Sequence, residues 1–177
     1  LDHEDFTGES TGHAVPKRAR RLILSATKRS LERKLKQPVQ GFRAPYLHAD
    51  PDLLLAVKDA GFAYDSSLYR SSKLRPPISE LWHPELKDRK GKLMSGYFWP
   101  FMEGKRPMED YLHALRKSRE PYVVLSTHSW HSRQTVDRVL SGKEALEKTS
   151  KLSEILSTLQ EKHEFVRPEP LLRIKKS

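Results

Sequence analysis

The feature that most constrains this chain is the alternation of helix-type and strand-type segments along it. The first is a helix predicted over residues 14–36, where small and aliphatic residues recur at steps of three and four among arginines and lysines. Its apolar positions are Ala19, Leu22, Ile23, Ala26, Leu31 and Leu35. Pro16 suits the first turn of this helix, and Pro38 ends it.

The next segments continue the alternation. A short strand is predicted at "VQGFR" (39–43), and "PDLLLAVKDA" predicts a helix with Asp50 as its N-cap and Pro51 at its first position. Gly61 stops that helix, and "FAYDSS" (62–67) predicts another short strand.

The second half of the chain is less regular at first. Residues 70–108 are rich in proline and glycine, with extended segments expected at "SELWH" (79–83) and "LMSGYFWPF" (93–101) and a helix over about 108–118. "YVVLSTH" (122–128) carries the strongest strand signal, because its β-branched and aromatic run is typical of a buried core strand. An amphipathic helix near 142–162 and a terminal strand "EFVRP" (164–168) complete the pattern.

This order predicts one α/β domain over residues 1–177 with a largely parallel sheet, since 177 residues suffice for a single core. Functional groups of such sheets gather at the C-terminal ends of the strands. Arg43, Asp65 and His128 all fall at predicted strand ends. The final strand would lie beside a first strand that the sequence does not supply, so the predicted fold is incomplete.

Composition limits the classes of partner. The 33 Lys and Arg against 23 Asp and Glu give a net charge of +10, which permits anionic partners, although the basic residues are spread along the chain as on solvated helix faces. The absence of cysteine excludes disulfides, thiolate zinc sites and cysteine nucleophiles, and it fits a cytoplasmic enzyme. No apolar run approaches the ~20 residues of a membrane span, so a membrane partner is not expected.

Two strand ends carry candidate chemistry. In "GFRAPY" (41–46), Arg43 is a cation on a turn that proline makes rigid, and the alternative is an ordinary surface arginine. In "LSTHSWH" (125–131), His128 is placed for general acid or base chemistry, and the alternative is a hydrogen-bonded structural histidine. Trp130 lies beside it, whereas His131 is expected to be solvated in the outgoing loop.

Two further stretches carry weaker signals. In "SELWHP" (79–84), Glu80 could orient a partner histidine and Trp82 could form the wall of a sugar-sized pocket, while the alternative is an exposed edge strand. His3, between acidic residues, is a candidate metal ligand, but one histidine makes no site and is otherwise a loose terminal residue.

Taken together, the motifs resemble the polysaccharide deacetylase family, also called the NodB-homology family or carbohydrate esterase family four. "GFRAPYLHADPDLLLAVKDAGFAYDSSL" is similar to its third motif and the segment that follows, and "LSTH" is similar to its fifth. "GYFW" (96–99) resembles a Gly-Tyr-Phe-Arg segment of a cytoplasmic branch with allantoinase-like and peptidoglycan deacetylase-like members. The order of "HED", the 14–36 helix and "FRAPY" also matches that branch, whereas the Asp-x-x-Trp pattern of the fourth motif is not clear.

The resemblance implies a distorted (β/α) barrel, here incomplete and without its first strand, and a divalent metal, usually zinc, that assists hydrolysis of an N-acetyl group or related carbon–nitrogen bond. It also implies that His3 is the second histidine of the metal pair and that Arg43 orients the catalytic base. By the same resemblance, His128 is the acid that protonates the leaving amine, and the backbone of Tyr46 contacts the oxyanion. The candidate substrate contacts are Trp82, Glu80, Pro45 and Trp130.

The first metal histidine and the first-motif aspartates of the family do not occur in residues 1–177. We therefore expect a truncated deacetylase that alone binds zinc poorly and does not hydrolyse amides. The expected substrate is an amino-sugar polymer or a small amide, and the oligomeric state stays open. The alternatives are a non-catalytic carbohydrate-binding relative and, with less support, a basic nucleic-acid-binding protein.

Overall fold

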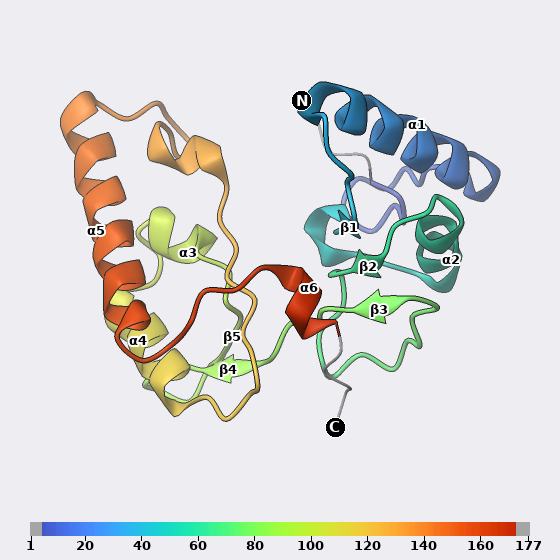
Figure 1. Cartoon of the computed structure of the whole chain (residues 1–177). Coiled ribbons are helices and arrows are strands. Elements are labelled where there is room, and N and C mark those ends of the chain that lie inside the picture. The colour runs from blue at the N-terminus through green and yellow to red at the C-terminus, as the bar shows by residue number, and fades with distance from the viewer. Residues whose placement is uncertain (1–4, 173–177) are drawn as a thin grey trace. The chain divides into compact units, whose positions relative to one another are not determined.

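A computed structural model describes residues 5–172 of the chain. These residues form two compact units, of which the first comprises residues 5–83 and 168–172 and the second comprises Pro84–Arg167. We call them unit 1 and unit 2 and describe each by itself. Figure 1 labels their α-helices and β-strands. None of the described helices is long and apolar enough to cross a membrane. The prediction of a single domain stays a prediction.

Unit 1 contains a small parallel sheet and the helices that its sequence patterns predict. The sheet has the order β1-β2-β3, with Gly41 and Phe42 paired to Tyr64 and Asp65, and these in turn to Ser79 and Glu80. Its elements are α1 (Lys17–Leu35), β1 (Gly41–Phe42), η1 (Pro45–Leu47), α2 (Pro51–Asp59), β2 (Tyr64–Asp65), β3 (Ser79–Glu80) and α6 (Pro168–Leu171).

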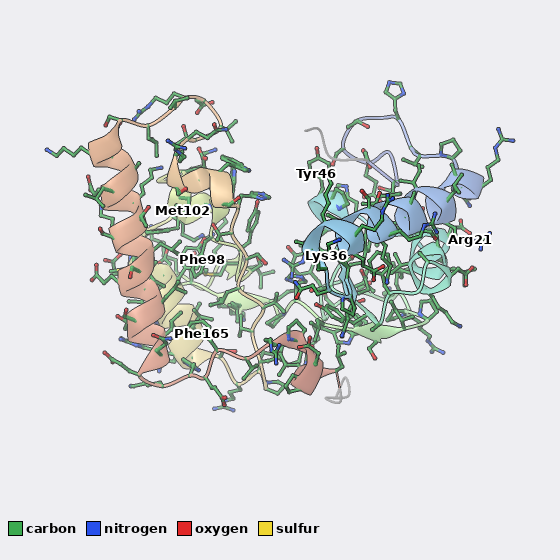
Figure 2. The ribbon with its side chains drawn as sticks, turned by 45° about the horizontal axis from the view of Figure 1, so that its top comes forward. Arg21, Lys36, Tyr46, Phe98, Met102 and Phe165 are labelled. Atoms are coloured by element: carbon green, nitrogen blue, oxygen red, sulfur yellow. The ribbon has the colours of Figure 1, made fainter. Side chains whose placement is uncertain are left out.

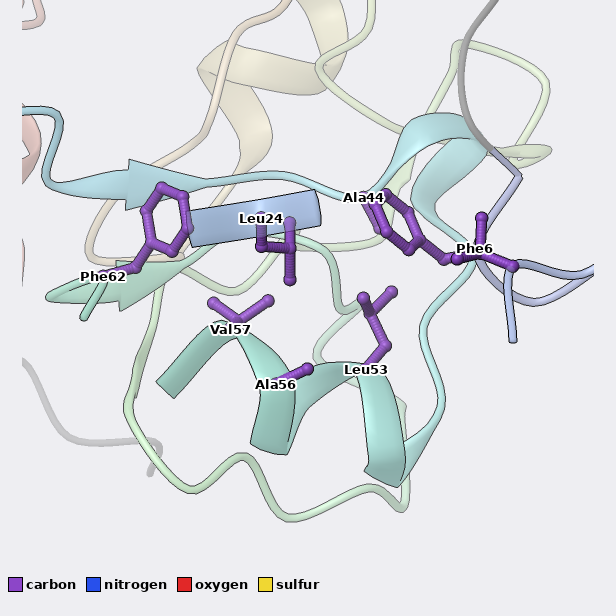
Figure 3. Packing of buried hydrophobic residues seen from close by; sticks show 8 residues of the cluster. Phe6, Leu24, Ala44, Leu53, Ala56, Val57 and Phe62 are labelled. Atoms are coloured by element: carbon purple, nitrogen blue, oxygen red, sulfur yellow. The ribbon is translucent and has the colours of Figure 1, made fainter. Parts of the chain in front are cut away.

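The helix α2 begins where its local sequence predicts. The Asp50 side chain accepts a hydrogen bond from the Leu53 N–H at 2.7 Å, which satisfies one of the free N–H groups of the first turn. The apolar face of α2 then contributes to the main core of unit 1 (Figure 3). The buried residues of that core are Phe6, Val15, Leu24, Ala44, Leu53, Ala56, Val57 and Phe62.

The predicted apolar face of α1 is only partly correct. Leu22, Leu31 and Leu35 are 69%, 43% and 54% exposed, whereas Arg20 and Leu24 are buried. Leu22 lies two residues from both buried positions, and at 100° per residue it therefore points to the opposite side of the helix. α2 has nine residues and α1 has 19, so α2 can cover only about half the length of α1. This leaves Leu31 and Leu35, near the C-terminal end of α1, exposed.

Unit 2 has a second core and an antiparallel pair of strands. Its elements are β4 (Leu86–Lys87), β5 (Leu93–Met94), α3 (Trp99–Met102), α4 (Met108–Lys117), η2 (Ser129–Ser132) and α5 (Gly142–Gln160). Phe98 and Met102, labelled in Figure 2, pack in this core with Tyr111, Ile155 and Leu159. The predicted helices at 108–118 and 142–162 are confirmed, and a Ser141–Glu144 capping box starts α5.

The strand predictions at 122–128 and 164–168 are wrong, whereas the extended segment predicted at 93–101 is confirmed in part, by β5 at Leu93–Met94. Residues 122–128 form no core strand. In the described structure, their β-type backbone pairing is limited to an isolated bridge between Ser126 and Tyr97, and all seven residues are half-buried or exposed. A β-branched run favours an extended chain, but a central strand also needs partners on both edges. Residues 99–101 begin the helix α3, and residues 164–168 form no strand, with Phe165 and Val166 exposed by 46% and 42%.

The observed fold is therefore mixed α/β, as the alternation predicts. The described residues contain a three-stranded parallel sheet and a two-stranded antiparallel pair, and these strands do not close into a barrel. The α/β class is confirmed at this level.

Candidate active site

Arg43 follows β1 directly and is held by the end of the neighbouring strand. Its Nε donates to the Ser66 carbonyl oxygen at 3.1 Å, and its Nη2 donates to the Ser66 Oγ at 3.0 Å. Residue 43 is nevertheless exposed overall. The arginine is thus oriented by Ser66 rather than loosely solvated, which distinguishes it from an ordinary surface arginine.

The turn after Arg43 has an uncommon backbone. Tyr46 and Leu47 have φ values of 59° and 60°, the left-handed region that residues other than glycine seldom occupy. Ala44 is buried, and its N–H donates to the Ser67 Oγ at 2.8 Å. The Tyr46 side chain is 52% exposed and is labelled in Figure 2. A strained turn of this kind persists when its surroundings hold it, and such turns cluster at functional sites.

Two buried carboxyl groups lie at the ends of β2 and β3, and both are hydrogen-bonded to Ser67, which also binds the Ala44 N–H of this turn. Asp65 and Glu80 are register partners in the sheet and are 0% and 8% exposed, and both carboxyl groups accept from the Ser67 N–H, at 3.2 and 3.0 Å. Burial, followed by the nearby charge of Asp65, raises the pKa of Glu80 to about 9, and burial also raises the pKa of Asp65. The Glu80 carboxyl is therefore protonated at neutral pH.

His83 completes the polar group of unit 1. Its Nε2 lies 2.9 Å from the Ser66 carbonyl oxygen and 3.2 Å from the Ser66 Oγ. Burial, with a smaller effect from the charge of Arg43, lowers the pKa of His83 to about 4. A neutral imidazole at pH 7 can donate this Nε2 proton to the Ser66 carbonyl, so His83 orients the residue that holds Arg43.

The structure does not give Trp82 and Glu80 the open positions that a sugar-stacking wall requires. Trp82 is 7% exposed and packs with Leu54 and Leu68, while the buried Glu80 carboxyl accepts from the N–H groups of Ser67 and Leu68. The segment after β3 is buried although β3 is a sheet edge, and Leu54 of α2 packs in the same cluster as Trp82. Neither alternative, a pocket wall or an exposed edge strand, describes these two side chains. Pro45, another candidate substrate contact, is half-buried and directly precedes Tyr46 and Leu47.

In unit 2, His128 lies in an aromatic setting. Its Nε2 is 2.5 Å from the Tyr97 Oη, and the two rings meet edge to face with centroids 5.6 Å apart. The Trp130 ring stacks on the imidazole, with 5.3 Å between centroids and 15° between planes. His128, Tyr97 and Trp130 are all half-buried. The imidazole is thus positioned by hydrogen bonding and stacking while part of it stays exposed to solvent.

His131 is fully buried, so the prediction of a solvated histidine is wrong. It is 0% exposed, its Nε2 lies 3.3 Å from the Glu103 Oε1, and the Trp130 ring packs against it at 3.9 Å between centroids. Burial lowers the pKa of His131, although the carboxylate of Glu103 opposes this shift. His131 lies in the 3₁₀ turn η2, which begins directly after His128 and in which His131 is the buried residue.

Sequence reasoning singled out Arg43 and His128 as candidates, but it assigned no role to Tyr97 or Glu103 and did not anticipate the carboxyl pair. Tyr97 lies in "GYFW", which the resemblance had singled out without assigning a role. Asp65 was recognised only as a strand-end residue, and its partnership with Glu80 depends on strand register, which short strands do not reveal from sequence.

The described residues do not supply the ligands of the predicted metal site. The predicted ligand His3 lies outside the described residues. Residues 5–172 contain no group of three or more histidine, aspartate or glutamate side chains that could hold a metal ion. The described residues therefore do not fit a metal centre by themselves, and the chemistry below assigns no step to an ion.

No protein-family model matches this chain, and neither a curated protein nor a solved structure matches it. The likeness to polysaccharide deacetylases accordingly stays a resemblance of motifs. Arg43 belongs to unit 1 and His128 to unit 2, and each motif has its own hydrogen-bonded support within its unit.

Proposed function

We propose that this protein is a hydrolase of non-peptide carbon–nitrogen bonds, and that its reaction is N-deacetylation of an amino-sugar polymer or a related amide. The observation that carries the proposal is the 2.5 Å contact between the Tyr97 Oη and the His128 Nε2, with Trp130 stacked on the same imidazole. The motif resemblance supplies the reaction class, and with it a divalent metal, usually zinc in the family, and a distorted, incomplete (β/α) barrel.

His128 is the proton donor in this proposal. Amide hydrolysis proceeds through a tetrahedral intermediate whose carbon–nitrogen bond breaks readily only when the amine is protonated. An imidazolium near pH 7 can give that proton and become neutral. The phenol of Tyr97 and the face of Trp130 hold the ring in one orientation, which removes rotational freedom before the transfer.

Arg43 has a supporting role. Its guanidinium, directly after β1, is held by Ser66 at the end of β2, so it can orient a carboxylate base or stabilise negative charge without reorganisation. Neither the base nor a set of metal ligands is assigned among residues 5–172, and His3 stays the candidate metal ligand from the sequence. The backbone of Tyr46 remains the candidate oxyanion contact.

The test compares acetate release from N-acetylated chito-oligosaccharides and peptidoglycan fragments, with zinc supplied. It uses the protein as the cell produces it, with any sequence that flanks residues 1–177. We expect His128→Asn to lower kcat by about 10²–10⁴-fold, the usual contribution of a general acid, while leaving the far-UV circular dichroism unchanged. Tyr97→Phe should lower kcat less, because the ring loses one hydrogen bond and keeps its aromatic contact.

The matched control is His163→Asn, since His163 is an exposed histidine of the same unit. It should keep wild-type activity. Wild-type acetate release by His128→Asn would overturn the assignment of the acid. Saturable binding of the oligosaccharides without any acetate release would replace the enzyme by the non-catalytic carbohydrate-binding relative.

A further inference from the structure

The buried carboxyl pair of unit 1 is connected to the Arg43 turn by a continuous set of hydrogen bonds. Glu80 Oε1 accepts from the N–H groups of Ser67 and Leu68, both at 3.0 Å. Asp65 Oδ1 accepts from the Ser67 hydroxyl at 2.7 Å, and the same Ser67 Oγ accepts from the Ala44 N–H at 2.8 Å. The conformation of Ser67 is therefore set by both carboxyl groups.

The remaining oxygen of Glu80 indicates where a proton lies. Glu80 Oε2 is buried and has no N–H or hydroxyl donor among the described residues. The other oxygen of the same carboxyl, Oε1, shares the Ser67 N–H with Asp65 Oδ2, so the two carboxyl groups lie close together. Two carboxylates in contact repel each other unless one of them carries a proton, as adjacent acid pairs do in other proteins. A single proton between Glu80 and Asp65 satisfies the otherwise unpaired oxygen.

The turn that depends on this arrangement is strained. Tyr46 and Leu47 occupy the left-handed region, and the Ala44 N–H bond to Ser67 ties the start of the turn to β2. A conformation of this kind relaxes when such ties are lost. Arg43, the residue before Ala44, is held in the same way by Ser66.

We infer that Asp65 and Glu80 are positioning residues, whose single shared proton holds Ser67 and thereby the turn from Arg43 to Leu47. The pair does not contact substrate in this scheme. It acts through Ser67 and Ala44 on the arginine that the proposed function uses, and to that extent the inference rests on the proposed function. Loss of the shared proton leaves two negative charges in contact and releases the turn.

Other charged groups near the strand ends bear on this titration. Arg43 comes from the end of β1, and His83 comes from the segment after β3, where its lowered pKa leaves it neutral at pH 7 and above. The charged residues of α2, which packs on this sheet, are Asp52, Lys58 and Asp59, and all three are exposed. The groups at the strand ends beside the pair are thus the cation of Arg43 and the neutral imidazole of His83, whereas the charges of α2 lie at the surface.

The test follows the pair by ¹³C NMR, with the Glu80 carboxyl carbon and the buried Ala44 methyl as probes. In the wild type we expect the Glu80 carboxyl to titrate near pH 9 and the Ala44 methyl to shift in the same step. Glu80→Gln keeps an oxygen acceptor for Ser67 and replaces the shared proton by an amide N–H. Its Ala44 methyl should resonate at the wild-type position at pH 7 and show no alkaline step. The exposed Ala26 methyl is the control.

Two results would overturn the inference. If neither carboxyl of the pair titrates above pH 7, no proton is shared; if Glu80 titrates but the Ala44 methyl does not follow, the pair does not position the turn. Glu80→Met, which removes both hydrogen-bonding functions, should displace the Ala44 methyl at pH 7 where Glu80→Gln does not. These readouts need no enzymatic activity, so they decide the inference even if the deacetylase assay fails.

Discussion

Arg20 provides the sharpest test of how unit 1 is held together. It is 2% exposed, and its guanidinium joins three segments of the chain. Its Nε donates to the Val15 carbonyl at 3.1 Å and its Nη2 to the Phe6 carbonyl at 2.5 Å. Its Nη1 lies 2.6 and 2.8 Å from the two carboxylate oxygens of Asp50, the N-cap of α2. Arg20→Met keeps most of the aliphatic volume and removes all of these donors.

The expected loss follows from what the substitution leaves behind. Breaking a buried ion pair by removing one partner destabilises a protein by about 3–5 kcal/mol, and each buried carbonyl left without a donor adds about 1–3 kcal/mol. These contributions are not additive, and the Asp50 side chain is 31% exposed, so water replaces part of the lost interaction. We expect Arg20→Met to lower the free energy of unfolding by about 3 kcal/mol, and the Tm by roughly 10 °C.

The assay is urea unfolding followed by far-UV circular dichroism, arranged as a double-mutant cycle with Asp50→Asn. Asparagine is also a good N-cap, so this variant removes the charge and keeps the cap. We expect a coupling energy of about 1.5–3 kcal/mol between the two positions. The control is Arg21→Met, because Arg21 is exposed on the same helix (Figure 2) and should change stability by less than about 0.5 kcal/mol.

Acid should remove the same interaction. Although burial of Asp50 acts in the opposite direction, the hydrogen bonds from Arg20 and Leu53 leave its pKa below the usual value. The stability that Asp50 contributes is therefore present above its unfolded pKa near 3.8 and is lost as the pH falls through the lower, folded value. If Arg20→Met lowers the free energy of unfolding by less than about 1 kcal/mol, or if the effects of the two substitutions are additive, Arg20 does not stabilise unit 1 by joining these three segments.

Two further predictions concern stability. The pKa of Glu80 is about 9 in the folded protein and 4.5 for the free side chain. The stability that Glu80 contributes is therefore fully present below pH 4.5 and is lost as the pH rises to 9. Glu80→Gln should thus be more stable than the wild type by roughly 3 kcal/mol at pH 7 and equally stable at pH 4. Urea midpoints between pH 4 and 9 measure this, with Glu9→Gln, an exposed carboxylate, as control; parallel curves for Glu80→Gln and wild type would contradict it. Gly96→Ala should lower the Tm of unit 2, because a Cβ at that position would lie 2.2 Å from the Val124 carbonyl oxygen, whereas Gly142→Ala meets nothing and should preserve it. Equal thermal shifts for the two glycines would show that the 96–98 and 124–126 segments are not in close contact.

The sequence by itself determined the elements whose causes are local. Asp50 and Pro51 start α2 where predicted, and the apolar spacing of residues 142–162 predicts the body of α5. Helix caps and i to i+4 spacing act within one or two turns, so nearby residues are enough to specify them. The motif around Arg43 and the end of "LSTH" at His128 were also recognisable, because each is a short continuous stretch.

Tertiary structure decided the features that depend on partners far along the chain. The run 122–128 has the composition of a core strand, yet it forms only a bridge to Tyr97, because strand pairing depends on neighbours rather than on propensity. Arg20 has the composition of a surface residue, yet carbonyls and a carboxylate from three segments make its burial favourable. Asp65 and Glu80 become a carboxyl pair only through the register of β2 and β3, since strand register sets which side chains meet and burial then determines their proton.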